Sequence, residues 1–373
     1  MRRIVNVSFT IIISLLCFFN FGLAWASEPY ITAPSAVLIE SETGQIIYQH
    51  RAKEKRPPAS TTKIMTAILA LELGDLEKPV KVSRYAANTE GSSIYLREGE
   101  VLKLKDLIKG ALMNSGNDAT VAIAESIGGS EEGFALLMNR KAKLIGALNT
   151  NFKNPHGLTE TGHYSSAYDL ALMARYAMKN AIFRKIVSTV EDTIPHPEGV
   201  RFLYNTNSLL GNYPGANGVK TGTTVAAGQC LVGSANRQGR ELISVVLGSS
   251  DRFLDTKKLL DYGFNNSYAE IVKAGEEIRK VNIKNGEVQS IGVTPVRTSG
   301  FTVKMDEAEF LEKKVFLPDV VKAPIKKGQE IGKVSIFFKG KEVETVPLVS
   351  IRNVEAKPWW SKLHLGVKEV VEK

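Results

Sequence analysis

The sequence predicts an α/β fold of the α+β type, in which a large domain with an antiparallel sheet and a helical subdomain precedes a small all-β domain. Helical and strand-like patterns alternate up to about residue 271. From Lys273 onward the pattern changes to short β runs separated by turns. A chain of 373 residues, 43% of them hydrophobic, can bury two separate cores, so we expect two domains.

The first 26 residues have the pattern of a secretory signal peptide. Met1-Arg-Arg3 precedes an apolar run over residues 11–21, and residues 24–26 form a small-x-small cleavage site. The apolar run is shorter than the roughly 20 residues that a membrane span requires. We therefore expect an exported protein whose mature chain begins at Ser27 and whose first domain covers residues 27–271.

One antiparallel sheet is predicted from segments that are far apart in the chain. The hairpin from Val37 to Tyr48 and later strands at Val219, Leu231 and Leu242 supply the strand patterns. Helices are expected on the faces of this sheet, with the helical subdomain inserted between its early and late strands. Removal of the signal peptide leaves Cys230 as the only cysteine, so no internal disulfide is expected and a buried thiol is predicted.

The first motif with a chemical meaning is Ser60-Thr-Thr-Lys63. Pro57 and Pro58 prevent a helix until about Ser60, and residues 61–72 are strongly helical. One helical turn separates Ser60 from Lys63, which places both side chains on one face of the helix. A lysine can accept the serine proton only if burial and a second cation lower its pKa, and Lys220 is the candidate cation.

The second motif is Ser115-Gly-Asn117. Residues 101–113 have helical spacing and the motif breaks that pattern, so Ser115 and Asn117 are expected on a turn between two helices. A second Ser-x-Asn, from Ser234 to Asn236, lies next to a predicted hairpin loop, and we interpret it as ordinary turn chemistry.

The third motif is Lys220-Thr-Gly222, which has the context of a strand beside the site. Its glycine is expected to let the substrate backbone lie close. Other chemistries have less support, because Gly-x-Ser-x-Gly is absent and the five histidines show no metal-binding spacing. We expect no cofactor and no metal, and we interpret His156 and His163 as supporting or turn residues.

Together the three motifs occur in the order found in class A β-lactamases and penicillin-binding proteins. The chain resembles the D-alanyl-D-alanine carboxypeptidases, the low-molecular-mass penicillin-binding proteins of the S11 serine peptidase family. The resemblance extends over most of residues 30–350. Its further landmarks are residues 33–44, 115–125, 138–139, 154–158, 164–170 and 205–210.

The resemblance implies a β-lactamase/transpeptidase-like fold and a set of residue roles. Ser60 is the expected nucleophile and Lys63 its general base, while Ser115 relays a proton to the leaving amine. Asn117 holds the lysine and the amide carbonyl of the substrate. The backbone N–H groups of Ser60 and Thr223 form the oxyanion hole, and the substrate-binding residues are Lys220, Thr221, Gly222 and Thr223.

Two departures from the family pattern concern the clamp for the terminal carboxylate of the substrate. Many members have His where this chain has Thr223, and some have Arg in the stretch where this chain has Thr206. Thr221 is the first candidate for the clamp, with Lys220 as its electrostatic partner. Arg252 or Arg201 could supply a guanidinium.

The implied activity is that of a serine-type D-Ala-D-Ala carboxypeptidase. It trims the terminal D-Ala from peptidoglycan pentapeptide stems and is acylated by β-lactam antibiotics. The alternatives are a DD-endopeptidase of the same family and a wall-organising protein that binds penicillin with little turnover. A class A β-lactamase is disfavoured because Glu160 is followed four residues later by Tyr164 rather than Asn.

The C-terminal part is expected to be a β-sandwich over residues 272–355, with a spacer role, followed by an amphipathic tail over residues 356–373. Trp360, Leu363, Val367 and Val370 repeat at helical spacing in that tail. Tryptophan and lysine side chains suit a membrane interface. The net charge of +9 falls by 2 to +7 when the signal peptide, with Arg2 and Arg3, is removed, and this positive charge favours an anionic membrane or wall polymer. We expect peripheral binding to the outer face of the cytoplasmic membrane and, because of export, no nucleic-acid partner.

Overall fold

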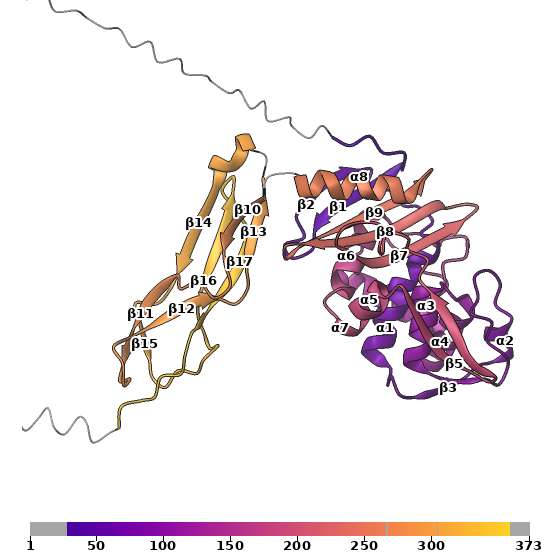
Figure 1. The fold of residues 1–373 in the computed structure, drawn as a ribbon, viewed down its shortest axis with the longest axis horizontal. Helices are drawn as coiled ribbons and strands as arrows, with labels where there is room; N and C mark the ends of the chain where they lie inside the picture. The colour runs from indigo at the N-terminus through magenta and orange to yellow at the C-terminus, as the bar shows by residue number, and fades with distance from the viewer. Residues whose placement is uncertain (1–27, 266–267, 304, 359–373) are drawn as a thin grey trace, which may run out of the picture.

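The computed structural model describes residues 28–265, 268–303 and 305–358 (Figure 1). The first part of the chain is built on a five-stranded antiparallel sheet with the order β2-β1-β9-β8-β7. The predicted N-terminal hairpin and the three later strands are confirmed as one sheet. The strands are β1 (Ser35–Glu40), β2 (Ile46–His50), β7 (Ala216–Thr224), β8 (Gly228–Arg237) and β9 (Arg240–Ser249).

The central strands are buried on both faces, which explains why their sequences are continuous apolar runs. On one face, Leu231 and Val246 pack in a core with Leu259 from α8 (Arg252–Asn265). On the other face, Val232 and Val245 join the large core of the helical part. The sheet therefore lies between α8 and the remaining helices of this part, as Figure 1 shows.

The helical part is inserted between β2 and β7. Its helices begin at residues suited to that position, since the side chains of Ser130, Ser166 and Asn180 accept hydrogen bonds from backbone N–H groups in the first turn. Its elements are η1 (Ala59–Thr62), α1 (Lys63–Leu73), β3 (Pro79–Lys81), α2 (Arg84–Ala87), β4 (Val101–Lys103), α3 (Leu104–Met113), α4 (Asn117–Gly128), α5 (Glu131–Ile145), α6 (Ala167–Ala177), α7 (Ala181–Ser188), β5 (Glu191–His196) and β6 (Gly199–Tyr204).

The C-terminal part is all-β apart from one short 3-10 turn, as expected. A six-stranded sheet has the order β14-β16-β17-β12-β11-β15, and β10 pairs with β13 in a separate two-stranded sheet. Because β10 pairs with β13, this region begins a few residues before the expected boundary at 272. Its elements are β10 (Tyr268–Val272), β11 (Arg279–Lys284), β12 (Ser290–Pro295), β13 (Ser299–Thr302), η2 (Met305–Phe310), β14 (Leu311–Phe316), β15 (Val320–Lys322), β16 (Glu330–Phe338) and β17 (Lys341–Ser350).

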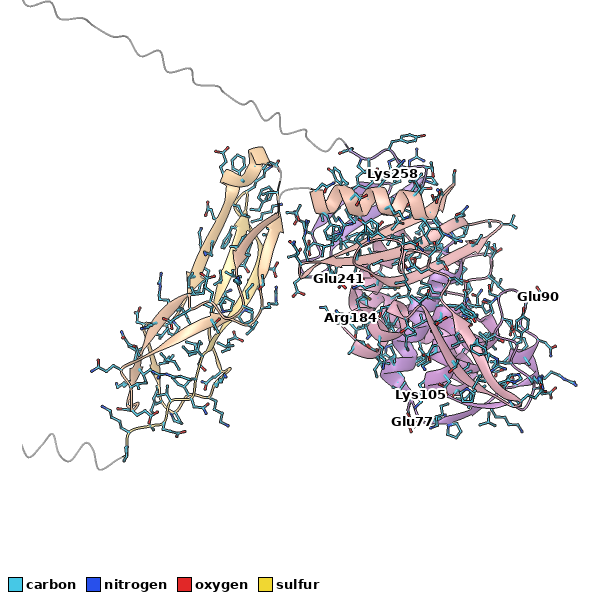
Figure 2. The ribbon with its side chains drawn as sticks, in the orientation of Figure 1. Glu77, Glu90, Lys105, Arg184, Glu241 and Lys258 are labelled. Carbon is cyan, nitrogen blue, oxygen red and sulfur yellow. The ribbon has the colours of Figure 1, made fainter. Side chains whose placement is uncertain are left out.

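A buried arginine joins the two parts. The Arg240 guanidinium lies 3.0 Å from a carboxylate oxygen of Glu40 in the first sheet, and it donates a 2.6 Å hydrogen bond to the Thr302 hydroxyl in β13. Nearby, Glu241 lies on the side of the first part that faces the C-terminal strands (Figure 2). The ion pair between Arg297 and Glu42, at 3.0 Å, adds a second link between the two parts.

Two expectations fall outside the described residues: the signal peptide at residues 1–26 and the apolar stripe that begins at Trp360. Within the described ranges, no helix combines the length and apolar character that a membrane span requires.

Candidate active site

The first motif lies where a 3-10 turn becomes a helix. Ser60 is in η1 and Lys63 is the first residue of α1, so the two side chains share one face, as the sequence predicted. Lys63 is completely buried, and its Nζ donates to Ser60 Oγ at 2.9 Å, to Asn117 Oδ1 at 2.7 Å and to the His156 carbonyl at 2.9 Å. These acceptors use every hydrogen of the ammonium group.

The electrostatic surroundings of Lys63 disfavour its charged form. Burial lowers the pKa of Lys63 well below its usual range, and the nearby charge of Lys220 lowers it further. The carboxylate of Asp118 acts in the opposite direction. The lysine is therefore held close to Ser60 in a place that favours the neutral amine, the form that can accept a proton.

The second motif is on the predicted turn between two helices, α3 and α4. Ser115 has a φ of +65° and is 6% exposed, while Asn117 is the first residue of α4. Asn117 donates from its backbone N–H to the Ser92 carbonyl at 2.7 Å and from its side-chain amide to the Glu90 carbonyl at 2.6 Å. These bonds orient the amide so that its oxygen faces Lys63. Glu90 lies at the outer edge of the helical part (Figure 2).

The third motif lies on β7, at the edge of the five-stranded sheet. Lys220 is 1% exposed and donates to the Thr221 carbonyl at 3.0 Å. Burial, and then the charge of Arg252, lower the pKa of Lys220 to about 7. The hydroxyl of Thr221 lies 2.6 Å from that of Thr206, the residue at which some relatives were expected to carry arginine.

Of the two candidate guanidinium groups, only one lies beside the third motif. Arg252 donates to the Gly222 carbonyl at 2.9 Å and to the Thr223 hydroxyl at 2.8 Å. Arg201 is instead paired with the Glu100 carboxylate at 2.9 Å, and both of those side chains are nearly buried. The structure therefore brings Arg252 to the site and holds Arg201 in a separate ion pair.

Position 222 requires glycine for a structural reason as well as for the expected close approach of the substrate. A β carbon at this position would lie 2.9 Å from the backbone nitrogen of Ser60 and 3.0 Å from that of Thr61. Real Cβ atoms essentially never come closer than 3.0 Å to another atom, as this one would to the Ser60 nitrogen. Only glycine therefore allows β7 to pack against the turn that carries Ser60.

The loop around His156 contributes more than the sequence indicated. Besides the His156 carbonyl bonded to Lys63, the Pro155 carbonyl accepts a 2.6 Å hydrogen bond from Thr66. Gly157 has a φ of +91°, and a β carbon there would meet the Ala59 carbonyl oxygen at 1.9 Å. His163 lies 3.0 Å from the Thr62 hydroxyl. The turn-forming sequence Pro155-His-Gly157 was the only feature that could have indicated this role. A sequence motif does not show that a backbone carbonyl will accept a hydrogen bond from Lys63.

Asp118 is a residue that sequence reasoning missed. Its carboxylate is fully buried and accepts hydrogen bonds from the Ser93 hydroxyl at 2.6 Å and from the backbone N–H of Leu96 at 3.0 Å. It thereby fixes the segment whose carbonyls orient Asn117. Its position directly after Asn117 was the only signal in the sequence.

A serine next to a buried lysine, a Ser-x-Asn turn and a Lys-Thr-Gly edge strand define the class of active-serine penicillin-recognising enzymes. Residues 24–251 match the family model of D-alanyl-D-alanine carboxypeptidase, and residues 267–356 match that of the penicillin-binding protein 5 C-terminal domain. The chain belongs to the D-alanyl-D-alanine carboxypeptidase family and is a serine-type carboxypeptidase. The resemblance predicted from the motifs is confirmed.

Named relatives agree with this assignment. The chain is 41% identical to D-alanyl-D-alanine carboxypeptidase DacF of Bacillus subtilis, with 87% of this chain and 86% of that protein covered. It is 32% identical to D-alanyl-D-alanine carboxypeptidase DacC of Escherichia coli, with 89% and 88% covered. Both matches extend through most of the C-terminal β region.

Solved structures show the same architecture. Penicillin-binding protein 5 of Haemophilus influenzae is similar with a TM-score of 0.67 and 30% identity, covering 88% of this chain and 98% of that one. A peptidoglycan synthesis regulatory factor (PBP3) of Streptococcus pneumoniae is similar with a TM-score of 0.75 and 25% identity, covering 88% and 100%. The predicted fold class is confirmed.

Proposed function

We propose that this chain removes the terminal D-alanine from peptidoglycan pentapeptide stems through an acyl-enzyme on Ser60. The observation that carries the proposal is the 2.9 Å contact between Lys63 Nζ and Ser60 Oγ in a buried, cation-flanked position. In its neutral form the amine keeps two N–H groups for Asn117 and His156, and its lone pair accepts the hydroxyl proton of Ser60. Ser60 Oγ then attacks the carbonyl carbon of the D-Ala-D-Ala bond.

The developing oxyanion is expected to accept hydrogen bonds from the backbone N–H groups of Ser60 and Thr223. Each such donor contributes about 3–4 kcal/mol of transition-state stabilisation in enzymes of this kind. The contact between Gly222 and the Ser60 nitrogen supports this assignment, because it brings the two chain segments together. Ser115 passes a proton to the amine of the departing D-Ala, and water then hydrolyses the ester on Ser60.

The terminal carboxylate of the substrate is expected to bind at Thr221 and Lys220, with Arg252 as the guanidinium. Two observations support this clamp. Arg252 donates a hydrogen bond to the Thr223 hydroxyl, and its charge lies close enough to Lys220 to lower the pKa of that lysine. Arg201 is the weaker candidate because its guanidinium is taken by Glu100 and by the Tyr95 carbonyl.

Two further parts of the proposal concern partners and place. Penicillins mimic the D-Ala-D-Ala terminus in this mechanism and are expected to acylate the same serine. The mature protein is expected to be extracytoplasmic and held at the outer face of the cytoplasmic membrane by residues 356–373. The helical spacing of Trp360, Leu363, Val367 and Val370 in that tail supports the membrane attachment.

The test compares D-Ala release with cross-link cleavage on purified wall fragments. We expect release of D-Ala from pentapeptide stems and little cleavage of cross-links. Dominant cross-link cleavage would indicate the DD-endopeptidase alternative. Stable penicillin binding without either product would indicate the wall-organising alternative.

A further inference from the structure

The β5–β6 hairpin presents an unusual row of side chains. Val200, Phe202 and Tyr204 alternate along β6 and are 57%, 62% and 59% exposed. The residues paired with them on β5 are Pro195, Thr193 and Glu191, and all three are exposed as well. Directly paired residues of two strands lie on the same face, so these six residues make one face of the hairpin. We call them the outer face.

The other face of the hairpin is firmly held by the protein. Ile194 and Leu203 belong to the large hydrophobic core. Arg201 forms the nearly buried pair with Glu100 at 2.9 Å, and Lys109 pairs with Asp192 at 2.7 Å. The hairpin is therefore anchored from one side, and the aromatic rings on its outer face are displayed from a fixed backbone.

The C-terminal end of β6, where the outer face ends, adjoins the active site. The backbone N–H of Tyr204, the last residue of β6, donates to the side chain of Asn114 at 2.8 Å, and Asn114 precedes Ser115. Two residues later, Thr206 contacts the hydroxyl of Thr221 at 2.6 Å. A ligand that occupies the active site and extends along β6 would pass over Tyr204 and then Phe202.

The chemistry of the outer face fits an uncharged ligand with apolar ring faces. Its only charge is the carboxylate of Glu191, so it offers nothing to an anionic lipid surface or to the carboxylates of a peptide. Six residues are also far fewer than the roughly 20–30 per side that a stable protein interface uses. Sugar rings differ from these partners, because their C–H faces are attracted to the negative face of an aromatic ring.

We propose that the outer face of the β5–β6 hairpin is a binding platform for the glycan strand of peptidoglycan, with Phe202 and Tyr204 as stacking residues. The proposal rests on the proposed function, since the glycan is the polymer that carries the pentapeptide stems. It adds a second contact with the substrate, outside the Ser-Lys centre. The platform makes polymeric strands better substrates than isolated stem peptides.

The direct test is binding of the full-length mature protein to uncharged, peptide-free glycan strands made of β-1,4-linked N-acetylglucosamine. The variant Phe202→Thr with Tyr204→Thr removes both rings and keeps residues that suit a strand. Loss of one or two stacking contacts, each of about 0.5–1.5 kcal/mol, corresponds to binding weaker by roughly twofold to 160-fold. Leu144→Ser, at a 76% exposed position on α5, is the matched control and should bind like the parent.

A second readout separates this proposal from the proposed function. The ratio of kcat/KM on strands bearing pentapeptides to kcat/KM on a soluble pentapeptide should fall in the double variant. The fall should come from a higher KM for the strands. Labelling of Ser60 by penicillin tests the catalytic centre independently. Unchanged strand binding in the double variant overturns the platform. The platform is also overturned if the parent binds vesicles or self-associates and the double variant loses that property instead. Lipid or a second copy of the chain would then be the occupant of the outer face.

Discussion

Gly222 on β7 packs against the backbone nitrogen of Ser60, leaving no room for a β carbon between the two segments. The third motif and the nucleophile are therefore linked by direct contact as well as by chemistry. Substrate binding on the edge strand and attack by the serine depend on one close approach of two backbones.

The variant Gly222→Ala tests this contact. The added methyl group has to push η1 away from β7, and we expect acylation by a fluorescent penicillin to fall at least tenfold, with a loss of stability of about 1–3 kcal/mol. Gly239→Ala is the matched control, because that glycine lies in the β8–β9 turn with nothing within 4 Å of the added carbon. It should lose some stability through its φ of +84° while acylation stays at the parental rate.

The variants Ser60→Ala and Lys63→Arg test the nucleophile and its base. We expect no covalent labelling by penicillin in Ser60→Ala. We expect Lys63→Arg to slow acylation by about 10²–10⁴-fold, because a guanidinium stays protonated and cannot accept the serine proton. Cooperative thermal unfolding of each variant serves as the folding control. Persistent labelling of folded Ser60→Ala, or parental acylation by folded Lys63→Arg, would refute these roles.

The pH dependence of kcat/KM tests the two buried lysines. Acylation should rise with pH as Lys63 loses its proton, and it should do so far below the usual range of lysine because burial lowers the pKa. Above about 7 Lys220 becomes neutral and attracts the substrate carboxylate less, so kcat/KM should fall again. In Arg252→Gln the descending limb should move to higher pH, because the charge of Arg252 lowers the pKa of Lys220. If the fall of kcat/KM occurs at the same pH in Arg252→Gln as in the parent, deprotonation of Lys220 is not its cause.

The stability of the protein should depend on the neutral form of His163. Burial lowers the pKa of His163 to about 4, and its Nδ1 accepts a hydrogen bond from the Lys153 backbone N–H at 3.1 Å. A depressed folded-state pKa stabilises the protein above the unfolded value of about 6.5, and that stability, about 3 kcal/mol, is lost as the pH falls toward 4 and below.

Urea unfolding at several pH values measures this contribution. His163→Gln should lose less stability than the parent between pH 7 and pH 4. His50→Gln, at an exposed position, serves as the control and should follow the parent. Identical pH profiles for the parent and His163→Gln would show that the buried imidazole does not carry the effect.

Truncation before Pro358 tests membrane attachment by the C-terminal tail. We expect D-Ala release from a soluble peptide to stay within about twofold of the parent, while flotation with vesicles is lost. Binding of the full chain should increase with anionic lipid and decrease with salt, because lysines contribute about 1 kcal/mol each near such a surface. Equal flotation of the two proteins, or none by either, would contradict the anchor.

Much of the fold was predictable because local patterns determine it. The apolar runs of β8 and β9, the helix after Pro58 and the turn at Ser115 each leave a signal in consecutive residues. The three motifs also indicated which chain segments meet, since their chemistry requires contact.

The remaining features depend on contacts between distant segments. Arg201 is held in an ion pair with Glu100, so Arg252 is the guanidinium left beside the third motif. The sequence did not indicate that Glu100 pairs with Arg201. The His156 carbonyl and the Asp118 carboxylate hold Lys63 and Asn117 in place through bonds to loops. No sequence spacing encodes such bonds, because they depend on how loops pack behind the site.

Cys230 gives this molecule a built-in reporter. It lies directly across from Gly222 in the β7–β8 pairing and is completely buried, and burial raises the pKa of its thiol. An alkylating reagent can reach the sulfur only when this edge of the sheet separates. Since the expected mature chain carries no other thiol, the rate of alkylation measures how often β7 separates from β8. Ligands that bind in the active site should lower this rate.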